Sequence, residues 1–155
     1  MAQSSVNVQA AHPVSIVFLL HILLEAPICF FALVRPEALP FLDMNNTTLI
    51  ALKLYAALLL SSFLSAYLVW GLPEFLPGKR ALALQLCLYH TIVTTALWHA
   101  PRFIPYTIGA GPESLGITVE RVWCASHALM SAALAIWWHV TLPYTAAIKS
   151  GAKTQ

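Results

Sequence analysis

Four apolar runs, each long enough to cross a bilayer as a helix, constrain this chain more than any other feature. They cover about residues 14–34, 49–72, 81–100 and 117–142, and a helix needs roughly 20 apolar residues to cross the hydrocarbon core. Of the 155 residues, 59% are hydrophobic and only 9% are charged, whereas soluble domains carry about 25% charged residues. The sequence therefore predicts an all-α integral membrane protein. We expect one four-helix bundle over residues 1–155, with both termini on the same side.

The ends of the runs indicate how the chain is threaded. The first twelve residues carry no Lys or Arg, whereas a secretory signal needs a positive segment at that place. We therefore interpret the first run as a retained transmembrane helix. Proline and glycine punctuate the three connections, and Pro143 is expected to end the fourth run before a short polar tail. Lys and Arg are nearly balanced between the two sides, which slightly favours cytosolic termini.

Composition also excludes some partners. The net charge of +2 is spread over every loop and forms no basic stripe of the kind that nucleic acid requires, so we expect no nucleic acid partner. Cys29, Cys87 and Cys124 have no metal-ligand spacing and are interpreted as small packing residues. Asn45 and Asn46 begin overlapping glycosylation sequons, which are usable only if their loop faces a lumen. We expect an internal membrane such as the endoplasmic reticulum.

His21 and Glu25 are the most informative polar residues, because they lie inside the first apolar run. Four residues apart on a helix, their side chains share one face and can touch. A carboxyl group at the centre of a bilayer is disfavoured by about 2.5–3.5 kcal/mol on insertion scales. Such a group indicates a functional site by default.

Two further histidines are predicted to reach the same depth. Glu25, His90 and His127 each lie about nine to eleven residues from the start of their runs, counting a rise of about 1.5 Å per residue. These three side chains should converge near the midplane of the bilayer, with His21 one turn nearer the termini. His99 and His139 lie at the ends of their runs, where polar side chains are ordinary interface residues.

Three hypotheses compete for this group. The first is acid/base catalysis, with Glu25, His21, His90 and His127 as the catalytic residues. Removal from water favours the uncharged forms of a carboxyl and of an imidazole, so a proton can pass between them. The second is a cofactor site, with His90 and His127 as axial ligands of haem or with His21, Glu25 and another His around a metal. The third is a structural role, in which interhelical hydrogen bonds fix the helix register.

The first hypothesis ranks highest. It predicts a protein that binds or converts a hydrophobic small molecule, such as an isoprenoid, a sterol or a polyketide-like intermediate of secondary metabolism. If it is an enzyme, it would be a membrane isomerase or cyclase, with Glu25 as the acid and His21 tuning it. No resident metal or cofactor is expected on this reading. The alternatives are a non-catalytic accessory subunit, with a membrane protein partner or a second copy, and, third, a haem-binding electron carrier.

Two short stretches suggest a family. Leu20–Pro27 reads LHILLEAP, and Leu88-Tyr89-His90 is followed twelve residues later by Arg102. In these stretches the chain resembles small four-span membrane proteins of filamentous fungi, a resemblance that implies the fold and no particular activity. It is more distantly similar to the sterol-isomerase and sigma-2-receptor-like four-helix membrane proteins. That likeness implies a central sterol cavity with buried acids, where this chain has one mid-membrane carboxyl, Glu25.

Overall fold

The computed structural model describes residues 11–151, and within them the chain forms helices and no strand. The first ten residues and residues 152–155, which include parts of the predicted polar ends, lie outside the described residues. Eight helical elements follow one another: η1 (Pro13–Ile16), α1 (Val17–Val34), η2 (Pro36–Ala38), α2 (Asn46–Trp70), α3 (Pro77–His99), α4 (Ala110–Ser114), α5 (Val119–Val140) and α6 (Leu142–Gly151).

Three segments of the described chain are long and apolar enough to cross a membrane: η1 with α1, then α2, then α3. Large apolar side chains cover their outer surfaces, among them Leu23 and Leu58, each 71% exposed. Exposed apolar surface of this extent is typical of a chain whose surroundings are lipid. The prediction of a helical membrane protein is therefore supported, with three candidate spans. The fourth run, now α5, is not among them.

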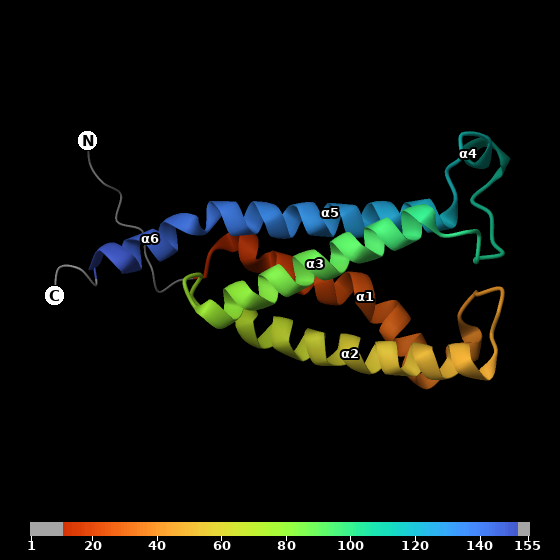
Figure 1. Ribbon diagram of the computed structural model, residues 1–155, viewed down its shortest axis with the longest axis horizontal. Coiled ribbons are helices and arrows are strands. Elements are labelled where there is room, and N and C mark those ends of the chain that lie inside the picture. The colour runs from red at the N-terminus through yellow and green to blue at the C-terminus, as the bar shows by residue number, and fades with distance from the viewer. Residues whose placement is uncertain (1–10, 152–155) are drawn as a thin grey trace.

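The helices pack in two close pairs that cross each other. α1 packs along α2, and α3 packs along α5. In Figure 1, α1 and α3 cross near the middle of the bundle, while α2 and α5 lie on the outer sides. One end of the bundle holds η1, the α2–α3 connection and α6; the other holds α4 and the long loops (Figure 1). Because α5 packs along α3, the crossing of α1 and α3 brings the central parts of α1, α3 and α5 together.

Helix ends differ from the predicted ones where local capping decides. α2 begins at Asn46, three residues before the predicted start, because the Asn45 side chain accepts a hydrogen bond from the Thr48 N–H at 2.9 Å and so caps the helix. At the other end of the chain, α5 ends at Val140, but Pro143 lies in the first turn of a new helix, α6. A first turn tolerates proline because its N–H would have no helical partner there. The helix after Pro143 was not predicted.

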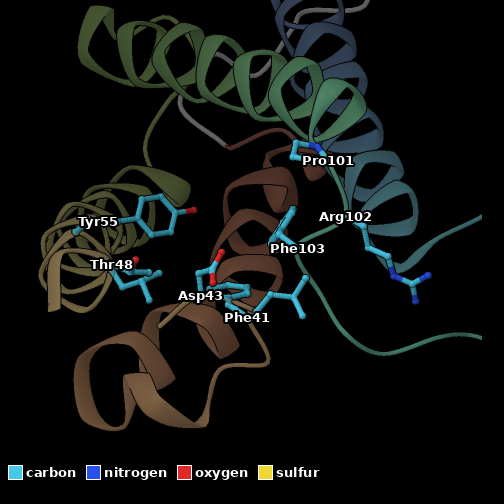
Figure 2. A pocket seen from close by; sticks show the side chains of 10 residues that line it. Phe41, Asp43, Thr48, Tyr55, Pro101, Arg102 and Phe103 are labelled. Atoms are coloured by element: carbon cyan, nitrogen blue, oxygen red, sulfur yellow. The ribbon is translucent and has the colours of Figure 1, made fainter. Parts of the chain in front are cut away.

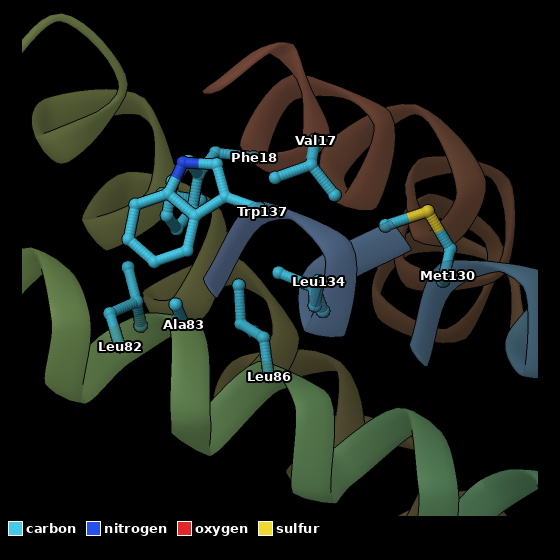
Figure 3. Close-up of a cluster of buried hydrophobic side chains, with 9 residues drawn as sticks. Val17, Phe18, Leu82, Ala83, Leu86, Met130, Leu134 and Trp137 are labelled. Atoms are coloured by element: carbon cyan, nitrogen blue, oxygen red, sulfur yellow. The ribbon is translucent and has the colours of Figure 1, made fainter. Parts of the chain in front are cut away.

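Two apolar clusters hold the bundle together, one on each side of its centre along the long axis. The first lies at the η1 end and joins α1, α3 and α5 around Trp137, Phe18 and Leu86, all 2% exposed or less (Figure 3). The second lies between α1 and α2 and consists of Cys29, Ala32, Ala56 and Leu59. Cys29, Cys87 and Cys124 are free thiols, as predicted. Along α1, His21 and Glu25 lie between the buried residues of the first cluster and those of the second.

A buried ion pair locks the η1 end. Lys79 and Glu74 are 3.0 Å apart, and both side chains are 0% exposed. The Lys79 ammonium also donates to the carbonyls of Trp70 and Leu72, at 3.1 and 2.8 Å, which ties the end of α2 to the start of α3. Glu74 accepts from the Ser15 hydroxyl at 2.7 Å. The short α2–α3 connection is therefore fastened to the beginning of the first membrane helix.

Lys79 and Arg80 are thus internal residues. The prediction of cytosolic termini counted both of them as free loop charges. The Arg80 guanidinium lies 4.0 Å from the centroid of the Trp138 ring and donates to the Thr141 hydroxyl at 3.1 Å. Charges held by protein partners give weaker evidence on orientation than charges in a loop.

Replacing Lys79 with Met should lower the free energy of unfolding by about 3–5 kcal/mol, because it leaves the buried Glu74 carboxylate without its counter-charge. The matched control is Arg35→Gln, which breaks a 3.8 Å pair with Glu37 whose side chains are about 70% exposed. We expect the control to match the wild type. Reversible unfolding in mixed detergent micelles, followed by circular dichroism, measures both, and equal stability of the two variants would contradict this account.

Candidate functional site

The crossing of α1 and α3 against α5 brings together all four of the predicted site residues. His21 and Glu25 come from α1, His90 from α3 and His127 from α5, and each is 0% exposed. The convergence predicted from their depth is confirmed by hydrogen bonds and close approaches between them. Their catalytic role stays a prediction. We call these four residues the central cluster.

The three histidines form one hydrogen-bonded row. It runs from the Ser62 hydroxyl to His21 Nε2 at 3.0 Å, from His21 Nδ1 to His90 Nε2 at 3.1 Å, and from His90 Nδ1 to His127 Nδ1 at 2.8 Å. His21 and Glu25, which were predicted to be able to touch, have ligand atoms within 4.8 Å of each other. His21 turns toward α2 and α3, where it hydrogen-bonds to Ser62 and His90, and it makes no hydrogen bond with Glu25 in the described structure. One turn of separation on a helix permits contact but does not impose it.

Ser62 sets the protons along this row when the imidazoles are neutral. Its hydroxyl hydrogen is donated to the carbonyl of Leu59 at 2.8 Å, so its oxygen accepts from His21 Nε2. His21 Nδ1 must then accept from His90 Nε2, since a neutral imidazole has one donor and one acceptor. His90 Nδ1 is left with a free lone pair, and it faces His127 Nδ1. The row therefore ends in two facing nitrogens, which fit either a hydrogen bond from a neutral His127 Nδ1–H to His90 or a metal ion between them.

Glu25 faces that nitrogen pair. Its Oε1 lies 3.4 Å from His127 Nδ1 and 3.9 Å from His90 Nδ1. This oxygen is buried and has no hydrogen-bond partner in the structure, as is also true of His127 Nε2. A buried oxygen without a partner costs about 1–3 kcal/mol or more. Such an atom in a native fold calls for an explanation.

Two tyrosines complete the site, and the sequence analysis missed them. Tyr55 of α2 donates its hydroxyl hydrogen to Glu25 Oε2 at 3.4 Å, and it is also hydrogen-bonded to the Tyr89 hydroxyl. The available signal was that both tyrosines lie well inside apolar runs. Ser62 was missed as well.

Other polar residues of the spans do not join the central cluster. Thr91, Thr94 and Thr95 donate to carbonyls one turn earlier in their own helix, at 2.7 to 3.0 Å. His99 and His139 are exposed near the ends of α3 and α5, in keeping with their interpretation as interface residues.

A cavity of about 340 Å³ between α2 and α3 leads to the central cluster. Its lining residues are His21, Tyr55, Leu58, Leu59, Ser61, Ser62, Gln85, Leu86 and Tyr89. Leu58 and Gln85 are exposed on the outer surface, so the cavity reaches the face that lipid would cover. Of the central cluster, only His21 lines it.

A second cavity, of about 450 Å³, lies at the end of the bundle with the long loops and also ends on Tyr55. Figure 2 shows Tyr55 projecting from α2, with Thr48, Asp43 and Phe103 around the same space. The Arg102 guanidinium is engaged elsewhere, with Glu113 at 3.0 Å. The two cavities therefore approach the cluster from different directions, and Tyr55 lies between them.

The observed geometry bears on the haem hypothesis. Two axial histidines must lie on opposite faces of a porphyrin, whereas His90 and His127 are hydrogen-bonded to each other at 2.8 Å. Haem ligation by this pair stays a prediction that requires the two rings to move apart.

Comparison with protein-family models, with curated proteins and with solved structures finds no match to this chain. The suggested resemblances to fungal four-span proteins and to sterol-isomerase-like proteins therefore stay predictions.

Replacing Tyr55 with Phe should lower the free energy of unfolding by roughly 1–3 kcal/mol, since it removes the hydrogen-bond donor of the buried Glu25 Oε2. Tyr67→Phe is the matched control on the same helix, because Tyr67 is 62% exposed. Thermal unfolding of both variants in one detergent measures the difference. If Tyr55→Phe is as stable as Tyr67→Phe, the hydroxyl is not needed to satisfy Glu25.

Proposed function

We propose that this chain is a four-span membrane protein of an internal membrane, with both termini on one side, that binds and converts a hydrophobic small molecule. The molecule would occupy the cavity between α2 and α3, and acid/base groups of the central cluster would act on it. The observation that carries the proposal is a cavity of about 340 Å³ that begins at the lipid-facing surface and ends on His21 and Tyr89.

α5 supplies the fourth span in this proposal. It has 22 residues, or about 33 Å of helix, enough to cross the hydrocarbon core. Its outward side chains include Val122, Leu129 and Ile136, all more than half exposed. Its two charged residues lie in the first turn, where a span meets the interface. An even number of spans returns the chain to the side on which it began.

The lining of the cavity defines the ligand class. Leucines form its apolar part, and its polar groups are hydroxyls, an amide and an imidazole; Lys, Arg, Asp and Glu are absent from the lining. A charged head group would therefore lack a counter-charge, whereas a neutral molecule with one hydroxyl or carbonyl group would find hydrogen-bond partners. Isoprenoid, sterol and polyketide-like molecules fit this description.

Conversion would use proton transfer at the polar end of the cavity. His21 lines the cavity and heads the imidazole row that continues to His90 and His127. Tyr89 lines it too and connects through Tyr55 to Glu25. A bound molecule would thus lie between two hydrogen-bonded groups that can exchange protons with it, an arrangement that suits an isomerase or cyclase.

A photoreactive sterol or isoprenoid probe should label the wild-type protein in lipid nanodiscs on the peptides that line the cavity. Ser62→Leu fills the polar end of the cavity and should reduce this labelling at least tenfold. Ser65→Leu is the matched control, because Ser65 is exposed on the same helix and lies outside the cavity. Mass spectrometry of the labelled peptides measures both, and equal labelling of the two variants would exclude the cavity as the binding place.

Conversion can be tested with the molecule that co-purifies with the protein as substrate. His21→Gln removes the imidazole at the cavity and should lower turnover by roughly 100-fold or more, the usual contribution of one acid/base group. His139→Gln changes an exposed histidine of α5 and should leave turnover unchanged. Wild-type turnover in His21→Gln would rule out His21 as the proton-transfer group.

One observation favours the alternative of an accessory subunit. An open groove of about 710 Å³ runs along the outer side of α1 and α2, lined by Ala57, Ser61 and Leu64 among other residues. Small residues on a helix surface allow another helix to approach closely in lipid. Under this alternative, gentle extraction would recover a partner chain in fixed stoichiometry, whereas a stable monomer would count against it.

A further inference from the structure

We propose that Glu25, His90 and His127 together bind one divalent transition-metal ion. This inference goes beyond the proposed function and does not rest on it, because none of the three side chains lines the ligand cavity. It rests on where three potential ligand atoms, from three different helices, are placed.

The distances among these atoms suit a single ion. His90 Nδ1, His127 Nδ1 and Glu25 Oε1 are separated by 2.8, 3.4 and 3.9 Å. Ligands that bind one ion at about 2.1 Å lie roughly 3.0–3.5 Å apart in octahedral or tetrahedral geometry. The 3.9 Å separation must shorten and the 2.8 Å separation must lengthen, each by a few tenths of an ångström. His21 also offers a nitrogen within 4.8 Å of ligand atoms of Glu25 and His90.

The hydrogen-bond pattern leaves lone pairs available to a metal ion on two of the three atoms, His90 Nδ1 and Glu25 Oε1. The hydrogen bond from Ser62 to the Leu59 carbonyl leaves His90 Nδ1 free of hydrogen, which is the form that binds a metal. Glu25 Oε1 points to the same place and has no hydrogen-bond partner. A proton on His127 Nδ1 can bond to His90 but leaves the Glu25 oxygen unsatisfied, whereas an ion engages all three atoms.

Supporting hydrogen bonds reach two of the three ligands, whereas His127 Nε2 has no partner in the described structure. In metal sites a ligating histidine usually donates its second N–H to a neighbour. His90 Nε2 pairs with His21 Nδ1 at 3.1 Å, and Glu25 Oε2 accepts from Tyr55 at 3.4 Å. Two imidazoles and one carboxylate favour borderline divalent ions such as Zn²⁺ or Fe²⁺ over Ca²⁺ or Mg²⁺. Three protein ligands leave at least one coordination position open.

The test is titration of the full-length, chelator-treated protein with Co²⁺ in detergent, followed by absorption spectroscopy and elemental analysis. We expect one Co²⁺ per chain, with visible d–d absorption, and its displacement by Zn²⁺. Glu25→Gln and His127→Gln should each weaken binding at least 100-fold. His99→Gln and His139→Gln, exposed histidines of α3 and α5, are the matched controls and should bind as the wild type does.

Unfolding of the wild type gives a second readout that needs no variant. Co²⁺ or Zn²⁺ should raise its midpoint temperature, because an ion held by three helices stabilises the folded state. A wild type that binds no Co²⁺ and gains no stability would overturn the proposal, as would equal binding by the ligand variants and the controls. Probe labelling of the chelated protein is independent of the metal, so the two proposals can fail separately.

Discussion

A polar group that is buried in a membrane bundle must find its partner inside the protein, and this constraint organises the whole structure. His21, Glu25, His90 and His127 come from three helices and are fully buried, so α1, α3 and α5 must meet at one level. The apolar clusters around Trp137 and around Cys29 then pack on either side of that level. The outer faces of the helices are apolar and favour no particular register. The polar contacts in the interior therefore set the register.

The same constraint acts at the η1 end of the bundle, where Lys79 and Glu74 are buried as an ion pair. That network is structural, since each group there bonds to backbone or to a neighbouring helix. Glu74 Oε2 and Glu25 Oε1 are both buried without a hydrogen-bond partner. The central cluster differs because three potential metal-ligand atoms from three helices, Glu25 Oε1, His90 Nδ1 and His127 Nδ1, lie within 3.9 Å of one another. We therefore interpret the central cluster as a binding site and the Lys79 network as a structural contact between helices.

Features that depend on the average hydropathy of a long segment could be predicted from the sequence. Contacts that depend on one particular neighbouring side chain were missed. Apolar runs located the helices to within a few residues, and depth within the runs predicted that Glu25, His90 and His127 meet. Lys79 was misread as a free loop charge because its partner carbonyls and Glu74 become neighbours only when the loop folds back. Tyr55 was missed because a hydroxyl inside a span can hydrogen-bond to several kinds of partner. Only the packing of α2 against α1 brings this hydroxyl to Glu25.

The central claim is that the central cluster exists to bind something and not only to hold helices together. Native mass spectrometry of the full-length protein, released gently from its own membranes, tests this claim most directly. The account predicts the 17.0 kDa chain carrying added mass from a small molecule that is not a bulk bilayer lipid. A bare chain that arrives in fixed stoichiometry with a partner protein would contradict it, and would assign the function to the complex.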